Sequence, residues 1–167
     1  MKRTIARRML VNFAFAVMLM TLLPTAYGQN CSLARAAGHY GVSDSGTVVG
    51  IGPRAALAVV TLDATGNLKG TVTANLNGTV TESTVSGTYT VNPDCTGVSN
   101  ISEFDSSGSL LLTATQNVVW DDNMREVRLI FTSAKLPDGT SLAAVISGNA
   151  RKLVSGNAQE VRPAIGQ

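Results

Sequence analysis

The sequence has few of the side chains on which enzyme active sites usually depend. His39 is the single histidine among 167 residues, and only two cysteines accompany it. One histidine without a paired Ser or Cys motif forms no catalytic triad, and no glycine-rich loop opens a helix that would hold phosphate. Neither cysteine has a second metal ligand nearby. We therefore expect no metal and no cofactor, assign no catalytic residue, and expect His39 to be a surface or turn residue.

Charged residues are also scarce, at 14% of the chain, and aromatic residues make up 5%. With 44% hydrophobic residues, the chain is too apolar for a disordered protein and too weakly charged for a nucleic-acid binder. Four of the 13 basic residues lie in the first eight positions. The rest of the chain contains nine basic and 11 acidic residues, so the net charge of +2 comes from the first eight positions. It therefore indicates no phosphate or acidic membrane partner.

The N-terminus carries a targeting pattern rather than a membrane span. Residues 1–8 hold four positive charges and no acid, and residues 9–23 are apolar with two exceptions. This run of about fifteen residues is shorter than the roughly 20 that a spanning helix needs. Small residues follow at Ala26 and Gly28. The pattern predicts a secretory signal peptide over residues 1–28, and a periplasmic or extracellular product of about 139 residues without a membrane span. A twin-arginine export signal is the alternative.

The two cysteines, Cys31 and Cys95, both follow the predicted signal peptide. An exported chain meets oxidants, so the sequence predicts one disulfide between them. Closing a loop of about 65 residues stabilises a fold by roughly 4 kcal/mol in the chain-entropy model. Two free thiols, or a pair between two molecules, are the alternatives.

From Tyr40 onward the sequence has no apolar spacing typical of a helix. Segments rich in Val, Thr, Leu and Ile alternate with turns that contain Gly, Asn or Asp, which is typical of β-strands. Asn77 and Gly78 tolerate the positive φ of a two-residue turn and therefore predict a hairpin. The pattern predicts strands over residues 40–43, 55–63, 68–76, 85–91, 98–104, 110–120, 125–134 and 142–152, with a longer loop over residues 44–54.

Eight short strands joined by short connections pair with their chain neighbours in antiparallel order. Curling into a barrel buries one face and removes the sheet edges that would aggregate. Gly70, Gly87 and Gly148 lie in mid-strand on the apolar face, where a barrel uses glycine to bend. We therefore predict an all-β fold, a single antiparallel up-and-down barrel of about eight strands over residues 29–152, with a flexible C-terminal tail over residues 153–167. A β-sandwich is the alternative.

An outer-membrane barrel would need aromatic girdles at two interfaces and an apolar outer band. Beyond the predicted signal peptide the chain has five aromatic residues, and it ends in Gly166 and Gln167 rather than in an aromatic residue. The clearest strands put Thr, Ser, Asn and Lys on one face, so we expect the apolar face to point into a barrel outside the membrane. The predicted core comprises Leu68, Val72, Val85, Tyr89, Leu112, Val127, Leu129, Phe131 and Ile146.

A few polar side chains are candidates for the barrel interior. The even positions of residues 110–120 form an apolar face that includes Gln116 and Trp120. Glu103 lies in a strand whose register the sequence leaves open. An inward Glu103 or Gln116 beside Tyr89 would orient a small ligand, whereas a packed core with hydrogen-bonded Gln116 and Tyr89 is the alternative. The candidate ligand-binding residues are therefore Tyr89, Glu103, Gln116 and Trp120.

Two turn regions have a functional and a structural interpretation. Residues 46–52 include three glycines and form either a simple connection or a lid at the barrel mouth. Residues 121–123, Asp-Asp-Asn, resemble the start of a calcium loop, but no acid downstream completes it. We expect a tight turn there.

The string Gly-Thr-Tyr-Thr-Val-Asn-Pro-Asp-Cys-Thr-Gly at residues 87–97 resembles the signature of a group of small exported bacterial proteins of unassigned function. Residues 38–43, 62–71 and 146–150 are similar to that group as well, so the resemblance covers about residues 31–152. It implies a single antiparallel barrel, broadly similar to the allene oxide cyclase barrel, with the two cysteines paired. A likeness of fold carries no activity, and no motif places a cyclase's catalytic residues on this chain.

These features favour a protein that holds a ligand over one that converts it, because the chain has no convergent set of titratable groups. We expect a non-enzymatic exported module that binds a small apolar ligand, or a partner in the envelope or outside the cell. One alternative is a cyclase-like isomerase or lyase that places one carboxylate, such as Glu103, in an apolar cavity. A structural or protein-interaction role is the other. Convergence of Glu103 and Tyr89 in a cavity would favour the enzyme, and a closed core would favour a surface partner.

Overall fold

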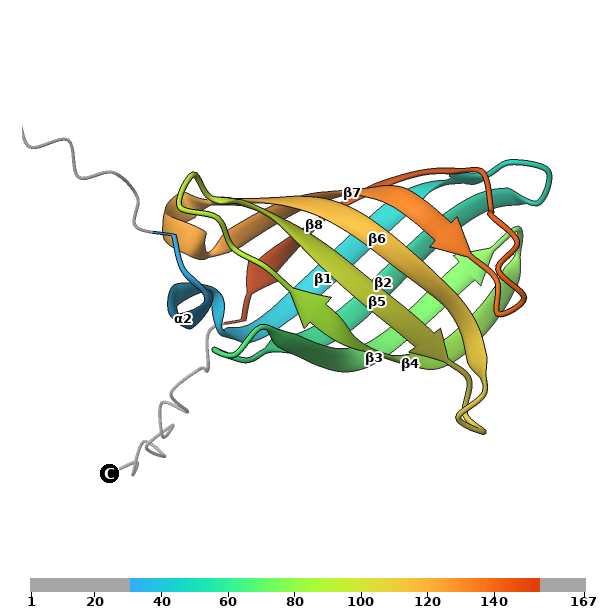
Figure 1. Cartoon of the computed structure of the whole chain (residues 1–167). Coiled ribbons are helices and arrows are strands. Elements are labelled where there is room, and N and C mark those ends of the chain that lie inside the picture. Colours follow the sequence, from blue (N-terminus) through green and yellow to red (C-terminus); the bar gives the residue numbers. More distant parts are fainter. Residues whose placement is uncertain (1–30, 154–167) are drawn as a thin grey trace, which may run out of the picture.

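The computed structural model describes residues 31–153, which form a closed barrel of eight strands (Figure 1). Each strand pairs antiparallel with the next along the chain, and the last returns to pair with the first. The predicted single up-and-down barrel is therefore confirmed, and the β-sandwich alternative is wrong. The strands are β1 (Gly38–Val48), β2 (Gly52–Leu62), β3 (Asn67–Leu76), β4 (Thr79–Tyr89), β5 (Thr96–Phe104), β6 (Leu110–Asp121), β7 (Glu126–Lys135) and β8 (Ala144–Lys152).

Within residues 31–153, helical structure is limited to two short pieces. One turn of helix, α2 (Leu33–Ala36), precedes β1, and a 3₁₀ turn, η1 (Asp122–Met124), links β6 to β7. No helix within residues 31–153 has the length and apolar character needed to cross a membrane. The predicted signal peptide over residues 1–28 and nearly all of the predicted tail lie outside the described residues.

Most of the predicted core faces the inside of the barrel. The fully buried members are Leu68, Val72, Val85, Tyr89, Val127 and Ile146. Leu129 and Phe131 are only partly buried because they line a cavity inside the barrel. Leu112 is also only partly buried, and it lies near the start of β6 at the barrel rim.

The hairpin between β3 and β4 forms where the sequence predicted it. Asn77 has a φ of 49° and Gly78 a φ of 90°, so both central residues of the turn use the left-handed region that Asn and Gly tolerate. β4 begins at Thr79, however, well before the predicted strand at residues 85–91. Pairing continues directly from the turn, but residues 79–82 are exposed on both faces, so the apolar alternation that signals a strand is missing there.

The predicted loop over residues 44–54 is wrong, and so is its interpretation as a lid. β1 and β2 continue through this region and are joined by a turn over residues 49–51. Glycine and proline make the segment resemble a loop, but Gly46 has a different role. A Cβ at this position would lie 2.0 Å from the carbonyl oxygen of Val145 on β8, so only glycine lets the two strands approach this closely.

Mid-strand glycines have the same role elsewhere in the barrel. A Cβ at Gly87 would lie 2.0 Å from the Asn100 carbonyl oxygen, and one at Gly148 would lie 2.4 Å from that of Ser43. Gly70 is in a similar position, with the Val59 carbonyl oxygen 2.2 Å away. These close approaches explain why glycine occupies the inward face of three strands that curl into a barrel.

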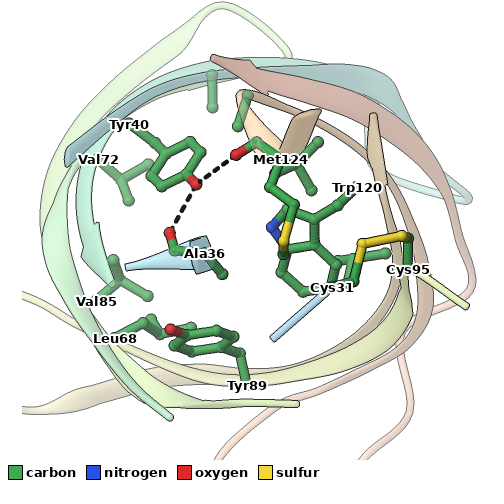
Figure 2. Packing of buried hydrophobic residues seen from close by; sticks show 14 of the residues in the cluster. Cys31, Ala36, Tyr40, Leu68, Val72, Val85, Tyr89, Cys95, Trp120 and Met124 are labelled. Atoms are coloured by element: carbon green, nitrogen blue, oxygen red, sulfur yellow. Dashed lines mark hydrogen bonds between the residues drawn. A yellow bond between two sulfur atoms is a disulfide. The ribbon is translucent and has the colours of Figure 1, made fainter. Parts of the chain in front are cut away.

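One end of the barrel is filled by residues 31–37, which we call the N-terminal plug (Figure 2). Ala36 is completely buried, and the Tyr40 hydroxyl donates to its carbonyl oxygen at 2.7 Å. The same hydroxyl lies 3.2 Å from the Met124 carbonyl oxygen. Cys31 is bonded to Cys95, which confirms the predicted disulfide and ties the plug to the turn after β4.

Cys95 lies in a type of five-residue turn that occurs four times in the part of the chain that the structure describes. In each turn the first N–H donates to the fifth carbonyl oxygen, the fourth N–H donates to the first carbonyl oxygen, and the fourth residue has a positive φ. Three of these turns have glycine at that place, with φ between 83° and 92°. Cys95 has a φ of 67°, a conformation that costs a non-glycine residue about 1 to 2 kcal/mol. The four turns are residues 63–67, 92–96, 105–109 and 136–140.

Two matched double variants separate the bridge from the backbone strain. We expect Cys31→Ser/Cys95→Ser to lower the free energy of unfolding by about 2 to 5 kcal/mol, because the bridge constrains the unfolded chain. Cys31→Ser/Cys95→Gly lacks the same bridge but relieves the strain, so it should be about 0.5 to 1 kcal/mol more stable than the serine pair. Urea unfolding measures both differences. A glycine pair no more stable than the serine pair would contradict the strain, and two free thiols in the wild-type protein would contradict the bridge.

Candidate functional site

A cavity of about 110 Å³ lies inside the barrel and is lined by residues of all eight strands. Most of its lining is aliphatic, and all four candidate residues, Tyr89, Glu103, Gln116 and Trp120, belong to it. Each of the four is buried. The register of β5, which the sequence left open, is set by pairing with β4, where Glu103 lies opposite the inward-facing Val85. The sequence therefore named four residues that share one cavity, and their role in binding stays a prediction.

Glu103 has one hydrogen-bond partner in the barrel. Its Oε1 accepts a hydrogen bond of 2.5 Å from the Ser83 hydroxyl, and both side chains are buried. Ser83 was not predicted to face the lumen, because the expected strand began at residue 85 whereas β4 begins at Thr79. The alternation of Val85 and Gly87, extended backward by one inward position, would have identified it.

A buried ion pair lies in the same part of the lumen. The Arg54 guanidinium donates to Asp44 Oδ1, and the two side chains are only 11% and 12% exposed. The Arg54 guanidinium also lies 5.8 Å from the centre of the Phe131 ring, within the range of a cation–π contact. Both charged residues fall in the segment predicted as a loop, which is why the sequence analysis did not find them.

The lumen holds more negative than positive charge. Burial raises the pKa of Asp44 above its usual value, the Arg54 guanidinium opposes this rise, and the negative charge of Glu103 adds to it. β1 and β5, which carry the two carboxyl groups, stand opposite each other in the ring of eight strands. Two acidic side chains therefore meet one basic side chain among the residues that line the cavity.

Two further polar groups in the cavity have no partner among residues 31–153. The Gln116 side chain is 9% exposed and forms no hydrogen bond with any described residue. The Trp120 indole N–H is buried, lies near the Tyr40 hydroxyl, and also makes no hydrogen bond within the described chain. Nearly all buried polar groups in proteins are hydrogen-bonded, and of these two only the Trp120 indole nitrogen is itself closed off from solvent.

The hydroxyl groups of Tyr40 and Tyr89, at the plug end of the barrel, both donate hydrogen bonds to backbone carbonyl oxygens. The Tyr89 hydroxyl donates to the Asp63 carbonyl oxygen, and burial, helped by the charge of Asp63, raises the pKa of Tyr89 to about 12. Burial also raises the pKa of Tyr40 to about 12. The neighbouring Tyr89 adds to that rise, and the Trp120 indole N–H offsets part of it. Both hydroxyls therefore keep their protons at neutral pH and donate to backbone carbonyl groups.

Tyr89 and Glu103 do not converge. Tyr89 pairs with Ser99 on β5, and Glu103 lies four residues further along that strand, about 13 Å away at the rise of a β-strand. The alternative of a packed core predicted that both Tyr89 and Gln116 are hydrogen-bonded. This is correct for the Tyr89 hydroxyl and wrong for the Gln116 side chain within residues 31–153. The Tyr89 ring lies beside that of Trp120, with centroids 6.2 Å apart, so its contribution to the cavity is an aromatic wall.

The outer surface carries the remaining residues that the sequence singled out. His39 is exposed, and its Nδ1 lies 3.0 Å from the Thr61 hydroxyl. It is a surface residue, as predicted. Within residues 31–153, no group of three His, Cys, Asp or Glu side chains is arranged to hold a metal ion.

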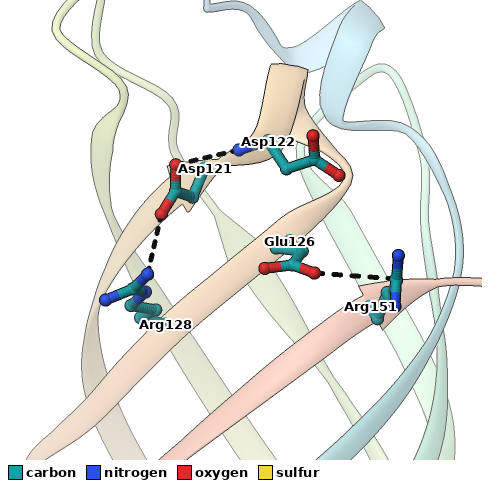
Figure 3. Close-up of polar contacts among 5 residues, drawn as sticks. All are labelled: Asp121, Asp122, Glu126, Arg128 and Arg151. Atoms are coloured by element: carbon teal, nitrogen blue, oxygen red, sulfur yellow. Dashed lines mark hydrogen bonds and ion pairs between the residues drawn. The ribbon is translucent and has the colours of Figure 1, made fainter.

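The tight turn predicted at residues 121–123 lies at residues 122–124, directly after the end of β6 at Asp121, and is flanked by exposed ion pairs (Figure 3). Asp121 accepts a hydrogen bond from the Asp122 N–H and pairs with Arg128 at 3.0 Å. Glu126 and Arg151 lie 3.6 Å apart on β7 and β8. Water screens such pairs, so each contributes little to stability, unlike the buried pair in the lumen.

No family model and no curated protein matches the chain. The structure of EF1p2_mFAP2b bound to DFHBI matches with 11% identity and a TM-score of 0.51, over 73% of this chain and 100% of that one. A redesigned β-barrel, mFAP1, bound to DFHBI, has 14% identity and a TM-score of 0.49, over 72% of this chain and 98% of that one.

The S-type phycobiliprotein lyase CPES from Guillardia theta has 8% identity and a TM-score of 0.44, over 74% of this chain and 91% of that one. At such low identities, the match with EF1p2_mFAP2b indicates a shared barrel fold and nothing about activity. The resemblance to a group of exported bacterial proteins, and to the allene oxide cyclase barrel, stays a prediction.

The buried ion pair predicts a large effect of one substitution. Arg54→Met leaves Asp44 without its partner in the lumen and should lower the free energy of unfolding by about 3 to 5 kcal/mol at pH 7. Arg128→Met removes an exposed pair and should change it by less than about 1 kcal/mol. The pKa of Asp44, already raised by burial, rises further without its partner, so the loss should shrink as the pH falls through this raised pKa and Asp44 gains a proton. Equal losses in the two variants, measured by urea unfolding, would contradict the ion pair's role.

Proposed function

We propose that this chain is an exported binding module that holds a small ligand in the lumen of its barrel. The observation that carries the proposal is that polar groups without a full set of hydrogen bonds line one cavity. Glu103 has a single hydrogen-bond partner, and Gln116 and Trp120 have none among residues 31–153. A ligand with polar atoms would satisfy these groups, while the aliphatic walls would bury its apolar part.

The volume of the cavity limits the size of the ligand. At about 110 Å³ it is smaller than the cavity of about 150 Å³ that accepts benzene in an engineered protein. We therefore expect a ligand, or an inserted ligand group, of about six non-hydrogen atoms or fewer. Even the best ligands of this size gain at most about 1.5 kcal/mol per atom, so binding is expected in the micromolar to millimolar range.

Export is the second part of the proposal. A disulfide between Cys31 and Cys95 suits an oxidising compartment, such as the periplasm or the extracellular space. The basic and apolar pattern of residues 1–28 suits a secretory signal. These two observations support each other, because both cysteines lie beyond that segment.

Binding is favoured over conversion by the placement of the titratable groups. Asp44 is engaged by Arg54, and Tyr89 donates to a backbone carbonyl oxygen at the other end of the lumen. An isomerase or lyase of the cyclase type would need Glu103 to work with a second acid or base close by. This arrangement gives the enzymatic alternative less support than the binding module.

A role in binding another protein is the second candidate function. Leu57 and Val59 are 68% and 52% exposed on the outer face of β2, where solvent would otherwise favour polar side chains. The outer face has no unpartnered buried polar group comparable to those of the lumen among residues 31–153. We therefore rank the lumen above the outer face.

Nuclear magnetic resonance with n-butanol as the probe tests binding in the lumen. Trp120 is the single tryptophan of the chain, so its indole N–H gives one signal from within the cavity. We expect a saturable shift of this signal at millimolar n-butanol, and loss of the shift in Ala58→Leu, which fills the cavity. Val59→Leu adds a methylene group to the next residue on the outer face and serves as the control. The absence of a saturable shift, or an unchanged shift in folded Ala58→Leu, would contradict the proposal.

A further inference from the structure

Among the residues that line the lumen, the balance of charge is uneven. Asp44 and Glu103 supply two carboxyl groups, and Arg54 supplies the one guanidinium. Arg54 donates to Asp44, so the positive charge is already paired. Glu103 is left with a hydroxyl group, that of Ser83, as its partner.

Burial makes this imbalance costly. Glu103 is only 7% exposed, and an ionised carboxyl group that is buried without a positive partner costs several kcal/mol. The Ser83 hydroxyl donates to Oε1 and leaves Oε2 without a described partner. A hydroxyl group supplies a single hydrogen bond and no charge, so it offsets only part of this cost.

A second polar group of the same cavity, Gln116, lies opposite Ser99, four residues along the strands from Glu103. The Gln116 side chain is 9% exposed, lines the same cavity, and has no partner among residues 31–153. Its amide oxygen is an acceptor that can receive a hydrogen bond from a cationic group, as can Glu103 Oε2. At the rise of a β-strand the two backbone positions lie about 13 Å apart, so the class of a compact ligand is inferred from Glu103 and not from Gln116.

We propose that the ligand of the lumen carries a compact organic cation, such as a primary ammonium group, which Glu103 binds as its counter-ion. This inference rests on the proposed function and specifies its ligand class. The ammonium group donates to Glu103 Oε2, and its carbon chain lies among the aliphatic side chains of the cavity wall. A metal ion does not fit as well, because no group of three acidic, His or Cys side chains converges within residues 31–153.

Three probes of equal length and different charge test whether the ligand of the lumen is a cation. We expect n-butylammonium to bind at least tenfold more tightly than n-butanol at pH 7, and butyrate to bind more weakly than either. Isothermal titration calorimetry measures all three affinities, and the comparison needs no variant. Equal affinity for n-butylammonium and n-butanol would leave the lumen as a binding site and overturn the cationic class. Tighter binding of butyrate would overturn it as well, and failure of all three probes to bind would overturn the proposed function itself.

Two glutamate variants test the residue. Glu103→Gln keeps the size of the side chain and removes its charge, so the preference for n-butylammonium over n-butanol should fall to within about threefold. Glu82→Gln makes the same change on the exposed face of β4 and should leave the preference at its wild-type value. A tenfold preference that persists in Glu103→Gln would overturn the role of Glu103. Urea unfolding of both variants shows that they are folded before the titrations are compared.

Discussion

Closure of the sheet between β1 and β8 is the constraint on which the other features of this protein depend. The two strands pair from Tyr40↔Lys152 to Val48↔Ala144, which fixes the register of the whole ring. In a closed barrel every second side chain along a strand points inward, whatever its polarity. Asp44 is therefore held inside by register, although a carboxyl group is costly to bury. The same register also brings Glu103 and Gln116 to the cavity.

The two ends of the lumen differ in how many of the hydrogen-bonding groups of their polar side chains have a partner. At the plug end, the hydroxyls of Tyr40 and Tyr89 donate to backbone carbonyl groups, and the disulfide fixes the plug against the turn after β4. Toward the other end, Glu103 keeps hydrogen-bonding capacity that no described residue uses. A barrel under selection for stability alone would gain by having aliphatic residues there. This contrast is the reason for proposing a binding role.

The sequence predicted those parts of the barrel in which alternation and turn chemistry agree. The even face of β6 placed Gln116 inside the lumen, and the barrel has it there. Asp44 and Arg54 were missed because the glycine and proline near them are typical of loops, whereas Gly46 is a strand residue required by the close approach of β8. The inward orientation of Glu103 depends on pairing with β4, which no local pattern reports. Pairing between strands, rather than local propensity, therefore determines the inward orientation of the residues whose placement the sequence left open.

The central claim is that the lumen, and not the outer wall, is the binding site. A crystal structure of the protein grown with 3-bromopropylammonium tests it most directly, because anomalous scattering from bromine locates the ligand without ambiguity. We expect bromine inside the barrel, with the ammonium nitrogen within about 3 Å of a Glu103 carboxylate oxygen. Bromine found only on the outer face, beside Leu57 and Val59, would contradict the account.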